Sequence, residues 1–257
     1  MFARVAPLRV LRSAALLGLI VALLGCAKRA GNDASFSEDA GVDPASIFED
    51  GRRWNVRRWT FPLDRYDFGI VDAEMASDLG AILERTGAEL VVNGGFYDKE
   101  NRAVGLAVTD GKMLSPFSRT TTGGVLTFDG ERARLDPTEA FDAGATPRFA
   151  VQCRPRLVVD GASNVKKDDG HRAERTALCV RDGGRTLEVF IARGEPDGQG
   201  PSLFAFGKKL ADLGCHGALN LDGGPSTGAA WRQGDSDRVA VIAPRRGIRH
   251  AIFFKKH

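Results

Sequence analysis

The chain of 257 residues has 43% hydrophobic and 27% charged residues, a balance typical of a globular protein. This composition excludes a disordered chain, a collagen-like chain and a membrane protein of many spans. The net charge of +3 comes from Arg4, Arg9 and Arg12, because the residues after them carry 33 basic and 33 acidic side chains. A neutral body without a basic run argues against nucleic acid as a partner.

The first 25 residues have the pattern of an export signal peptide. A basic start is followed by 15 uncharged residues, 13–27, which is shorter than the roughly 20 apolar residues of a membrane span. The end of this stretch, Leu23-Leu24-Gly25-Cys26, resembles the signal of bacterial lipoproteins, in which the cysteine is lipidated. We therefore expect an exported lipoprotein of the bacterial cell envelope, anchored in the membrane through Cys26. A plain secretory signal and a short membrane anchor are the alternatives.

The chain after Cys26 divides into a short linker and one large domain. Residues 26–46 contain almost no large apolar side chains and predict a flexible tether. Residues 47–257 are enough for a single domain. Three cysteines remain in it, Cys153, Cys179 and Cys215, and they allow either one disulfide and one thiol or three buried thiols. Their spacing does not suggest a metal site, and we expect neither a metal nor a cofactor.

Turn signals organise the domain. Asp-Gly pairs begin at residues 110, 129, 160, 182 and 197, several of them between alternating apolar runs that predict β-hairpins. Residues 77–85 and 202–213 have helical periodicity, and each segment is followed by a glycine that favours helix termination. The sequence therefore predicts an α+β fold, a single β-rich domain with a mixed sheet, hairpins and a few flanking helices.

Two strand ends share one pattern. Leu90-Val91-Val92 leads to Asn93-Gly94-Gly95, and Ala218-Leu219-Asn220-Leu221 leads to Asp222-Gly223-Gly224. Each buried strand thus delivers one polar side chain, followed by two glycines whose backbone can approach a ligand closely. Side by side, the two ends would form one pocket. The alternative is that Asp222-Gly223 is simply another turn.

Four motifs, taken in order, resemble the phosphodiester glycosidase domain. They are Asn93-Gly94-Gly95-Phe96-Tyr97, Gln152-Cys153-Arg154-Pro155-Arg156-Leu157 with Asp160-Gly161, Arg175-Thr176-Ala177, and Asn220-Leu221-Asp222-Gly223-Gly224-Pro225-Ser226-Thr227. The resemblance covers about residues 55–255. It implies a hydrolase that cleaves a glycosyl phosphodiester of the envelope or exopolysaccharide and releases the sugar. One residue departs from the pattern, because Arg154 stands where the family commonly has glycine.

The resemblance also implies roles for individual residues. Asp222 would be the catalytic carboxylate, as nucleophile or as base toward water. One carboxylate is chemically sufficient because a phosphate monoester leaves easily at neutral pH. Arg175 would hold the phosphate, and Asn93 would bond the sugar or orient Asp222. The implied substrate-binding residues are Gly94, Gly95, Phe96, Gln152, Arg156, Gly223, Gly224, Ser226 and Thr227.

Two other functions fit parts of the sequence. Residues 224–228 match the G-x-S-x-G motif of serine hydrolases, with Ser226 followed by Asp235 or Asp237 and by His250. The segment after Ser226 is too short for the helix that this motif requires. A non-catalytic glycan-binding lipoprotein of the envelope is the other alternative.

Overall fold

A computed structural model describes residues 46–194, 198–234 and 238–257. The predicted signal peptide, Cys26, nearly all of the tether, and Asp235 and Asp237 lie outside these residues. In the described part of the chain no helix is long and apolar enough to cross a membrane.

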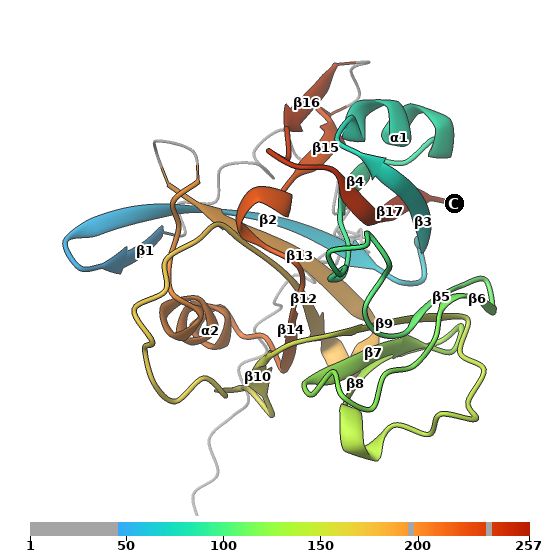
Figure 1. Ribbon diagram of the computed structural model, residues 1–257, viewed down its shortest axis with the longest axis horizontal. Helices are drawn as coiled ribbons and strands as arrows, with labels where there is room; N and C mark the ends of the chain where they lie inside the picture. The colour runs from blue at the N-terminus through green and yellow to red at the C-terminus, as the bar shows by residue number, and fades with distance from the viewer. Residues whose placement is uncertain (1–45, 195–197, 235–237) are drawn as a thin grey trace, which may run out of the picture. The chain divides into compact units, whose positions relative to one another are not determined.

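The strands in the described part of the chain form three sheets (Figure 1). The seven-stranded sheet has the order β1 (Ser46–Glu49), β2 (Arg52–Pro62), β13 (Thr186–Arg193), β12 (Arg175–Arg181), β14 (Gly217–Asn220), β10 (Arg156–Val159), β11 (Ala162–Ser163). One five-stranded sheet has the order β16 (Val239–Ile242), β15 (Ala229–Arg232), β4 (Leu90–Asn93), β17 (Ile248–Lys256), β3 (Tyr66–Ala76). The other has the order β6 (Lys112–Ser115), β5 (Ala107–Thr109), β9 (Phe149–Cys153), β7 (Gly124–Phe128), β8 (Ala133–Pro137).

The prediction of a β-rich domain is confirmed, but the prediction of one mixed sheet is wrong. Every strand pair among the described residues is antiparallel. The physical reason lies in the connections, because many strands are joined by short turns. Such turns can link only antiparallel neighbours, whereas parallel strands need long crossovers. Few of the described residues are helical, so the α+β description fits this fold only loosely.

The predicted hairpin turns lie where the Asp-Gly pairs stand. Asp110, Asp160 and Asp182 have φ angles of 47°, 49° and 53°, and the glycine after each also has positive φ. Two successive residues with positive φ are the mark of the type I′ turn, which matches the twist of paired strands. The first two turns join β5 to β6 and β10 to β11. Asp182 and Gly183 instead lie in a longer loop, residues 182–185, that includes a 3-10 turn and joins β12 to β13. The fifth pair, at residue 197, begins outside the described residues.

All three sheets contribute to one central core. Its largest side chains include Trp59 and Phe61 from β2, Phe254 from β17 and Phe149 from β9, all at most 1% exposed. Phe61 and Phe254 stack with their ring centroids 4.2 Å apart, which ties the seven-stranded sheet to the β4–β17 sheet. The strands are thus fixed by burial of apolar surface on their inner faces.

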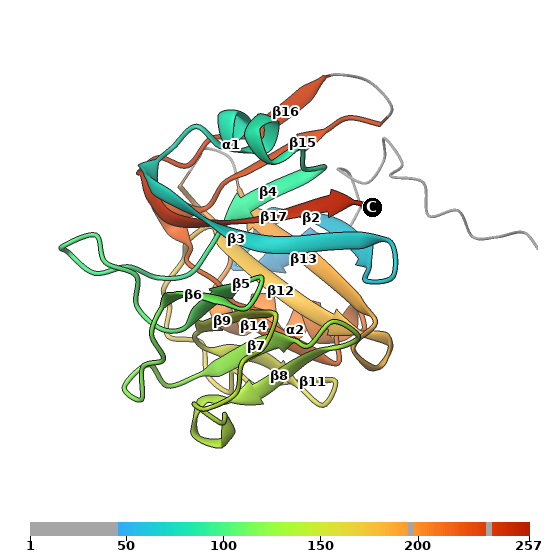
Figure 2. The ribbon, with the colours of Figure 1, turned by 90° about the vertical axis from the view of Figure 1, so that its right-hand side faces the viewer.

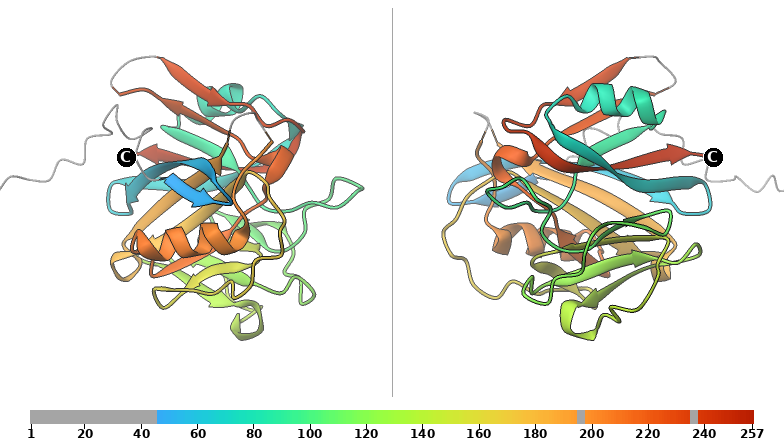
Figure 3. Two further views of the ribbon diagram at one scale, coloured as in Figure 1. Left: turned by 90° about the vertical axis from the view of Figure 1, so that its left-hand side faces the viewer. Right: turned by 45° about the vertical axis from the view of Figure 1, so that its right-hand side comes forward.

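Within residues 46–194, 198–234 and 238–257, two α-helices cover the outer faces of two sheets. Helix α1 (Leu79–Thr86) lies against β4, β15 and β17 (Figure 2), and its residues Leu79, Ile82 and Leu83 are buried there. Helix α2 (Leu203–Asp212) lies along the seven-stranded sheet (Figure 3), and its residues Phe206 and Leu210 are buried against that sheet. Both predicted helices are therefore confirmed. Their N-caps are the side chains of Asp78 and Ser202, and glycines with positive φ follow both helices. Short 3-10 helices lie at Thr138–Ala140, Asp182–Gly184 and Gly224–Ser226.

The cysteines adopt the first of the two predicted arrangements. Cys179 of β12 and Cys215, which precedes β14, form a disulfide, while Cys153 is a buried thiol. Burial raises the pKa of the Cys153 thiol to about 12, so it stays protonated and unreactive at neutral pH. The carboxylate of Glu188 lies near the two paired sulfurs, but sulfur in a disulfide is not a thiolate ligand for a metal.

Candidate active site

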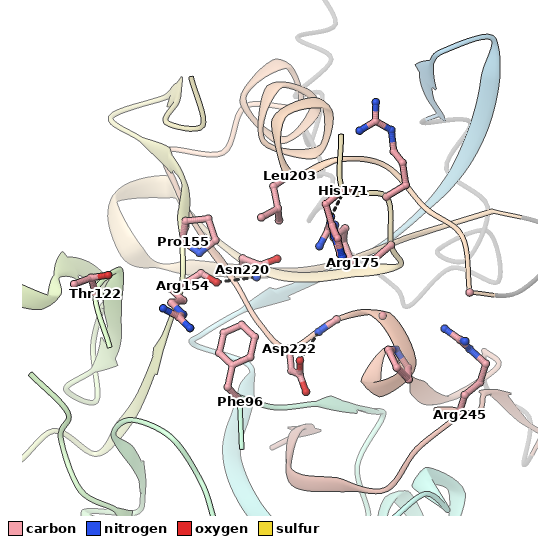
Figure 4. Close-up of a pocket in the computed structure, with 16 residues that line it drawn as sticks. Phe96, Thr122, Arg154, Pro155, His171, Arg175, Leu203, Asn220, Asp222 and Arg245 are labelled. Atoms are coloured by element: carbon pink, nitrogen blue, oxygen red, sulfur yellow. Dashed lines mark hydrogen bonds between the residues drawn. The ribbon is translucent and has the colours of Figure 1, made fainter. Parts of the chain in front are cut away.

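A cavity of about 680 Å³ opens where β12 begins and β14 ends (Figure 4). Five of the residues singled out in the sequence line it, namely Phe96, Arg175, Asp222, Gly223 and Gly224. The other lining residues are Thr122, Arg154, Pro155, His171, Arg172, Ala173, Gly198, Leu203, Asn220, Pro225 and Arg245. The cavity combines several guanidinium groups, one aromatic ring and one carboxylate, so it suits a ligand that has both apolar faces and negative charge.

Asp222 is the only acidic residue among the described residues that line the cavity. Its Oδ1 accepts a hydrogen bond from the N–H of Gly223 at 2.9 Å, and the hydroxyl of Ser226 also bonds this side chain. Burial raises the pKa of Asp222, while the bonds from Ser226 and Gly223 and the charge of Arg246 oppose this shift. A partly desolvated carboxylate that is held by two donors is suited to act as a base or a nucleophile.

Asn93 lies behind this carboxylate and is fully buried. Its Nδ2 donates to the backbone carbonyl of Asp222 at 2.7 Å, and its Oδ1 accepts from Thr176 Oγ1 at 2.8 Å and from the N–H of Gly228 at 3.2 Å. These bonds join the ends of β4 and β14, as expected from their shared sequence pattern. Of the two roles considered for Asn93, the geometry favours orientation of Asp222, because its amide group is occupied by the protein.

Arg175 begins β12 and lies in the same cavity as Asp222. Its Nε donates to the carbonyl of Pro201 at 3.1 Å, and one Nη donates to the carbonyl of His171 at 2.8 Å. These neutral acceptors orient the guanidinium without cancelling its charge. Burial lowers the pKa of Arg175, yet a guanidinium remains protonated at neutral pH. Arg175 is thus a fixed positive charge in the cavity wall.

The glycines predicted to bind substrate mainly allow backbone segments to approach each other closely. Most of their N–H groups already donate hydrogen bonds within the protein. The N–H of Gly94 donates to His250, that of Gly224 donates to Glu174, and that of Gly223 donates to the Asp222 side chain. A Cβ on Gly94 would lie 2.8 Å from the His250 carbonyl oxygen, and one on Gly223 would lie 2.8 Å from the Glu174 carbonyl oxygen. Close approach of neighbouring strands therefore explains both glycines. Gly95 packs against Cys153.

Several predicted binding residues lie outside the cavity lining. Gln152 is 1% exposed, and its amide bonds the backbone of Leu106, Ser118 and Thr121, so it fixes the loop that leads to Thr122. Thr227 is also buried. Arg156 lines a different cavity of about 480 Å³, together with Arg134, Leu135 and His216. Pro155 lines the first cavity and the next residue, Arg156, lines the second, because successive side chains of a strand point to opposite faces of the sheet. Arg156 is therefore separated from Asp222.

The structure adds basic residues that sequence reasoning did not select. Arg245 lines the cavity and donates to Glu174 at 2.7 Å, and Arg246 is the nearby charge that acts on Asp222. The N–H groups of both residues donate to the carbonyl of Pro225, which fastens their segment beside the Asp222 loop. They belong to no recognisable motif, and only the path of the chain between β16 and β17 brings them here.

The serine hydrolase alternative does not fit the local structure. Ser226 ends a 3-10 helix, is 3% exposed, and is followed by the strand β15 rather than by a helix. The G-x-S-x-G motif requires a strand, a sharp turn and then a helix. Its hydroxyl is also engaged with Asp222, so Ser226 supports that carboxylate.

Comparisons with known proteins agree with the motifs. The family model described as phosphodiester glycosidase matches residues 86–255. The fold is similar to that of the zebrafish N-acetylglucosamine-1-phosphodiester alpha-N-acetylglucosaminidase catalytic domain, auto-inhibited by its pro-peptide (TM-score 0.63, 17% identity, 83% of this chain and 81% of that one). No curated protein sequence matches the chain.

Two further crystal structures have a similar fold. One is a hypothetical protein from Synechocystis, with a TM-score of 0.61 and 15% identity over 82% of this chain. This chain spans 61% of the length of that protein. The other is a putative exported protein from Burkholderia pseudomallei, with a TM-score of 0.57 and 14% identity over 79% of this chain and 74% of that one. At such identities the likeness shows the fold.

Proposed function

The chain belongs to the phosphodiester glycosidase family, and we propose that it hydrolyses a glycosyl phosphodiester at the cavity that contains Asp222. The observation that carries this proposal is the pairing of one half-buried carboxylate with fixed guanidinium groups in a single cavity. Hydrolysis of a glycosyl phosphodiester needs both groups. The carboxylate activates or acts as the nucleophile that attacks the anomeric carbon, and the guanidinium groups stabilise the negative charge of the leaving phosphate.

In this proposal water attacks the anomeric carbon, and the bond between that carbon and the phosphate oxygen breaks. The phosphate leaves as a monoester with the bonding electrons, and the water proton passes to Asp222 and then to solvent. In the alternative course, Asp222 attacks first and water then releases the sugar. Since the second pKa of a phosphate monoester is about 6, the leaving group needs little protonation. One carboxylate therefore suffices in either course.

The donors of the cavity wall support the proposed placement of the phosphate. Arg175 projects from the start of β12, and Arg245 comes from the segment before β17. A guanidinium presents its donors in a plane that matches phosphate oxygens. The neutral bonds that hold Arg175 keep it in place before substrate binds, so little reorganisation would be needed as charge develops on the phosphate.

Release of free sugar from synthetic glycosyl phosphodiesters tests this function. We expect turnover by protein that begins at residue 46, and a loss of about 10²- to 10⁴-fold or more in kcat for Asp222→Asn. Asp160→Asn is the matched control, because Asp160 also precedes a glycine but stands in a hairpin turn away from this cavity. Sugar binding without turnover across the panel would instead favour the non-catalytic glycan-binding function.

We further propose that the protein works in the cell envelope as a lipoprotein. The support is the sequence that ends at Cys26, together with the Cys179–Cys215 disulfide, since disulfides persist mainly in exported proteins. Expressed from its full gene, the protein is expected in the membrane fraction, and Cys26→Ala is expected to release it. Membrane association that survives Cys26→Ala would refute the lipid anchor.

A further inference from the structure

We propose that the sugar part of the substrate is acidic and that Arg154 binds its carboxylate. This inference rests on the proposed function and specifies its substrate class. It starts from a comparison of the four arginines that line the cavity, Arg154, Arg172, Arg175 and Arg245.

Three of these arginines have partners within the protein. Arg172 forms ion pairs with Glu49, Asp50 and Asp168, at 3.1, 2.6 and 2.8 Å. Arg245 pairs with Glu174, and Arg175 donates to two backbone carbonyls.

Arg154 differs from all three. Within the described ranges its guanidinium has neither an ion pair nor a hydrogen bond, and the residue is exposed. A guanidinium with all of its donors free is therefore available at the cavity wall. Its planar pair of N–H groups matches the two oxygens of a carboxylate.

The orientation of Asn220 indicates which part of the substrate lies beside Arg154. Asn220 is 5% exposed, and its Nδ2 donates to the backbone carbonyl of Arg154 at 2.8 Å. This bond fixes the amide orientation, because only the nitrogen can donate to a carbonyl. The Oδ1 of Asn220 is then a buried acceptor without a hydrogen-bond partner. Such an atom favours a ligand group that donates.

A sugar fits this position and a phosphate does not. Sugar hydroxyls donate hydrogen bonds, whereas an ionised phosphodiester only accepts them, so an unpaired Oδ1 would repel it. The ring of Phe96 also lines the cavity and offers an apolar face to the sugar. In Figure 4, Phe96, Thr122 and Arg154 lie to one side of Asp222, and Arg245 lies to the other. We therefore place the sugar on the Arg154 side and the phosphate toward Arg175 and Arg245.

The charges of the cavity leave a place for a second negative group on the substrate. A phosphodiester carries a single negative charge, and Arg175, whose hydrogen bonds go to neutral backbone carbonyls, provides a positive charge for it. Arg154 would remain without a counter-charge beside a neutral sugar. A uronic acid supplies the carboxylate on the sugar itself, where Arg154 can reach it.

The test compares two diesters that differ only at the sugar, a glucuronosyl and a glucosyl phosphodiester with the same aglycone, each as both anomers. Affinities are measured by calorimetry in the Asp222→Asn background, which prevents turnover. We expect the glucuronosyl diester to bind about 10- to 100-fold more tightly, the size of a charge-assisted hydrogen-bonded pair. Arg154→Gln is expected to abolish this difference, with a much smaller loss of affinity for the glucosyl diester than for the glucuronosyl diester, and Arg154→Lys is expected to keep part of the difference.

Arg119→Gln is the matched control, because it removes the same charge from an exposed residue that does not line the cavity. It is expected to keep the full difference. Equal affinity of the two diesters, or a difference that persists in Arg154→Gln, would overturn the role of Arg154. Failure of the wild-type protein to hydrolyse any diester would contradict the proposed function instead, and the affinity ratio would still decide on Arg154.

Discussion

The side-chain amide of Asn93 donates a hydrogen bond to the backbone carbonyl of Asp222 at 2.7 Å. A fully buried residue at the end of β4 thereby holds the main chain of the loop that carries the cavity carboxylate. In the opposite direction, the backbone N–H of Asp222 donates a hydrogen bond to the carbonyl of Gly94 at 3.2 Å. The carboxylate is thus positioned by a strand of another sheet, which couples the fold to the site.

Asn93→Ala is expected to lower both stability and catalytic rate. The substitution leaves the Asp222 carbonyl, the Thr176 hydroxyl and the Gly228 N–H without a buried partner, which costs at least about 2 kcal/mol of unfolding free energy. Movement of Asp222 by a fraction of an ångström is expected to lower kcat by up to about 10²-fold with little change in KM. Denaturant unfolding and steady-state kinetics measure the two effects.

Thr176→Val serves as the control for Asn93→Ala. It removes one donor to Asn93 but leaves the bond between Asn93 and Asp222, so we expect a loss of about 1 kcal/mol in stability and a nearly unchanged kcat. A kcat for Asn93→Ala as high as that of Thr176→Val would show that Asn93 acts only in folding.

Local signals in the sequence predict much of the fold. Asp-Gly turns, alternating strands and the two capped helices depend on neighbouring residues, and all of these appear in the described residues. The number of sheets depends on which strands meet across long stretches of chain. Strand β2 pairs with β13, more than 120 residues later, and no local pattern encodes that pairing. The short turns predict antiparallel pairs locally, but the direction of distant pairs such as β2 and β13 is not encoded locally, which is why the prediction of one mixed sheet was wrong.

The sequence likewise predicts some residues of the site but not others. Asp222, Arg175 and Phe96 stand in motifs and line the cavity, whereas Arg245 and Arg246 reach it through tertiary structure alone. Gln152 and Arg156 stand in a motif but lie outside the cavity lining. Gln152 shapes a loop, and Arg156 faces a second cavity. A motif therefore marks residues that the site requires, without distinguishing those that contact a ligand from those that hold the chain.

The raised pKa of Asp222 predicts that Asp222→Asn stabilises the protein near neutral pH. Because burial raises the pKa of this carboxyl above its ordinary value of 3.8, the folded state binds the proton more tightly than the unfolded state. The ionised carboxylate therefore lowers stability at pH values above its folded-state pKa, and this loss disappears below about pH 3.8. Asparagine avoids the burial of charge, so its midpoint of thermal unfolding is expected to exceed that of the wild type at pH 7.

The difference in midpoint between Asp222→Asn and the wild type should shrink steadily as the pH falls toward 3.8. In the active enzyme, kcat/KM should fall on acidification through the raised pKa of Asp222, since the ionised form is the reactive one. A destabilised Asp222→Asn protein at pH 7 would contradict the assignment of a desolvated carboxylate.

Loss of the disulfide is expected to destabilise the fold around the cavity. The bond joins Cys179 of β12 to Cys215, just before β14, across 36 residues, and β12 and β14 deliver Arg175 and Asp222. The double substitution Cys179→Ala and Cys215→Ala should lower the unfolding free energy by about 3–4 kcal/mol, the chain-entropy value for a loop of this length. Denaturant titrations of the wild type with and without reductant measure the same loss.

Cys153→Ala provides the comparison for this disulfide. It removes a buried thiol that is outside the bond, so the variant should keep its sensitivity to reductant. The double variant should lose that sensitivity, because its remaining cysteine in the domain has no partner there. If reductant lowered the stability of the double variant as much as that of the wild type, Cys179–Cys215 would not be the bond that stabilises the folded protein.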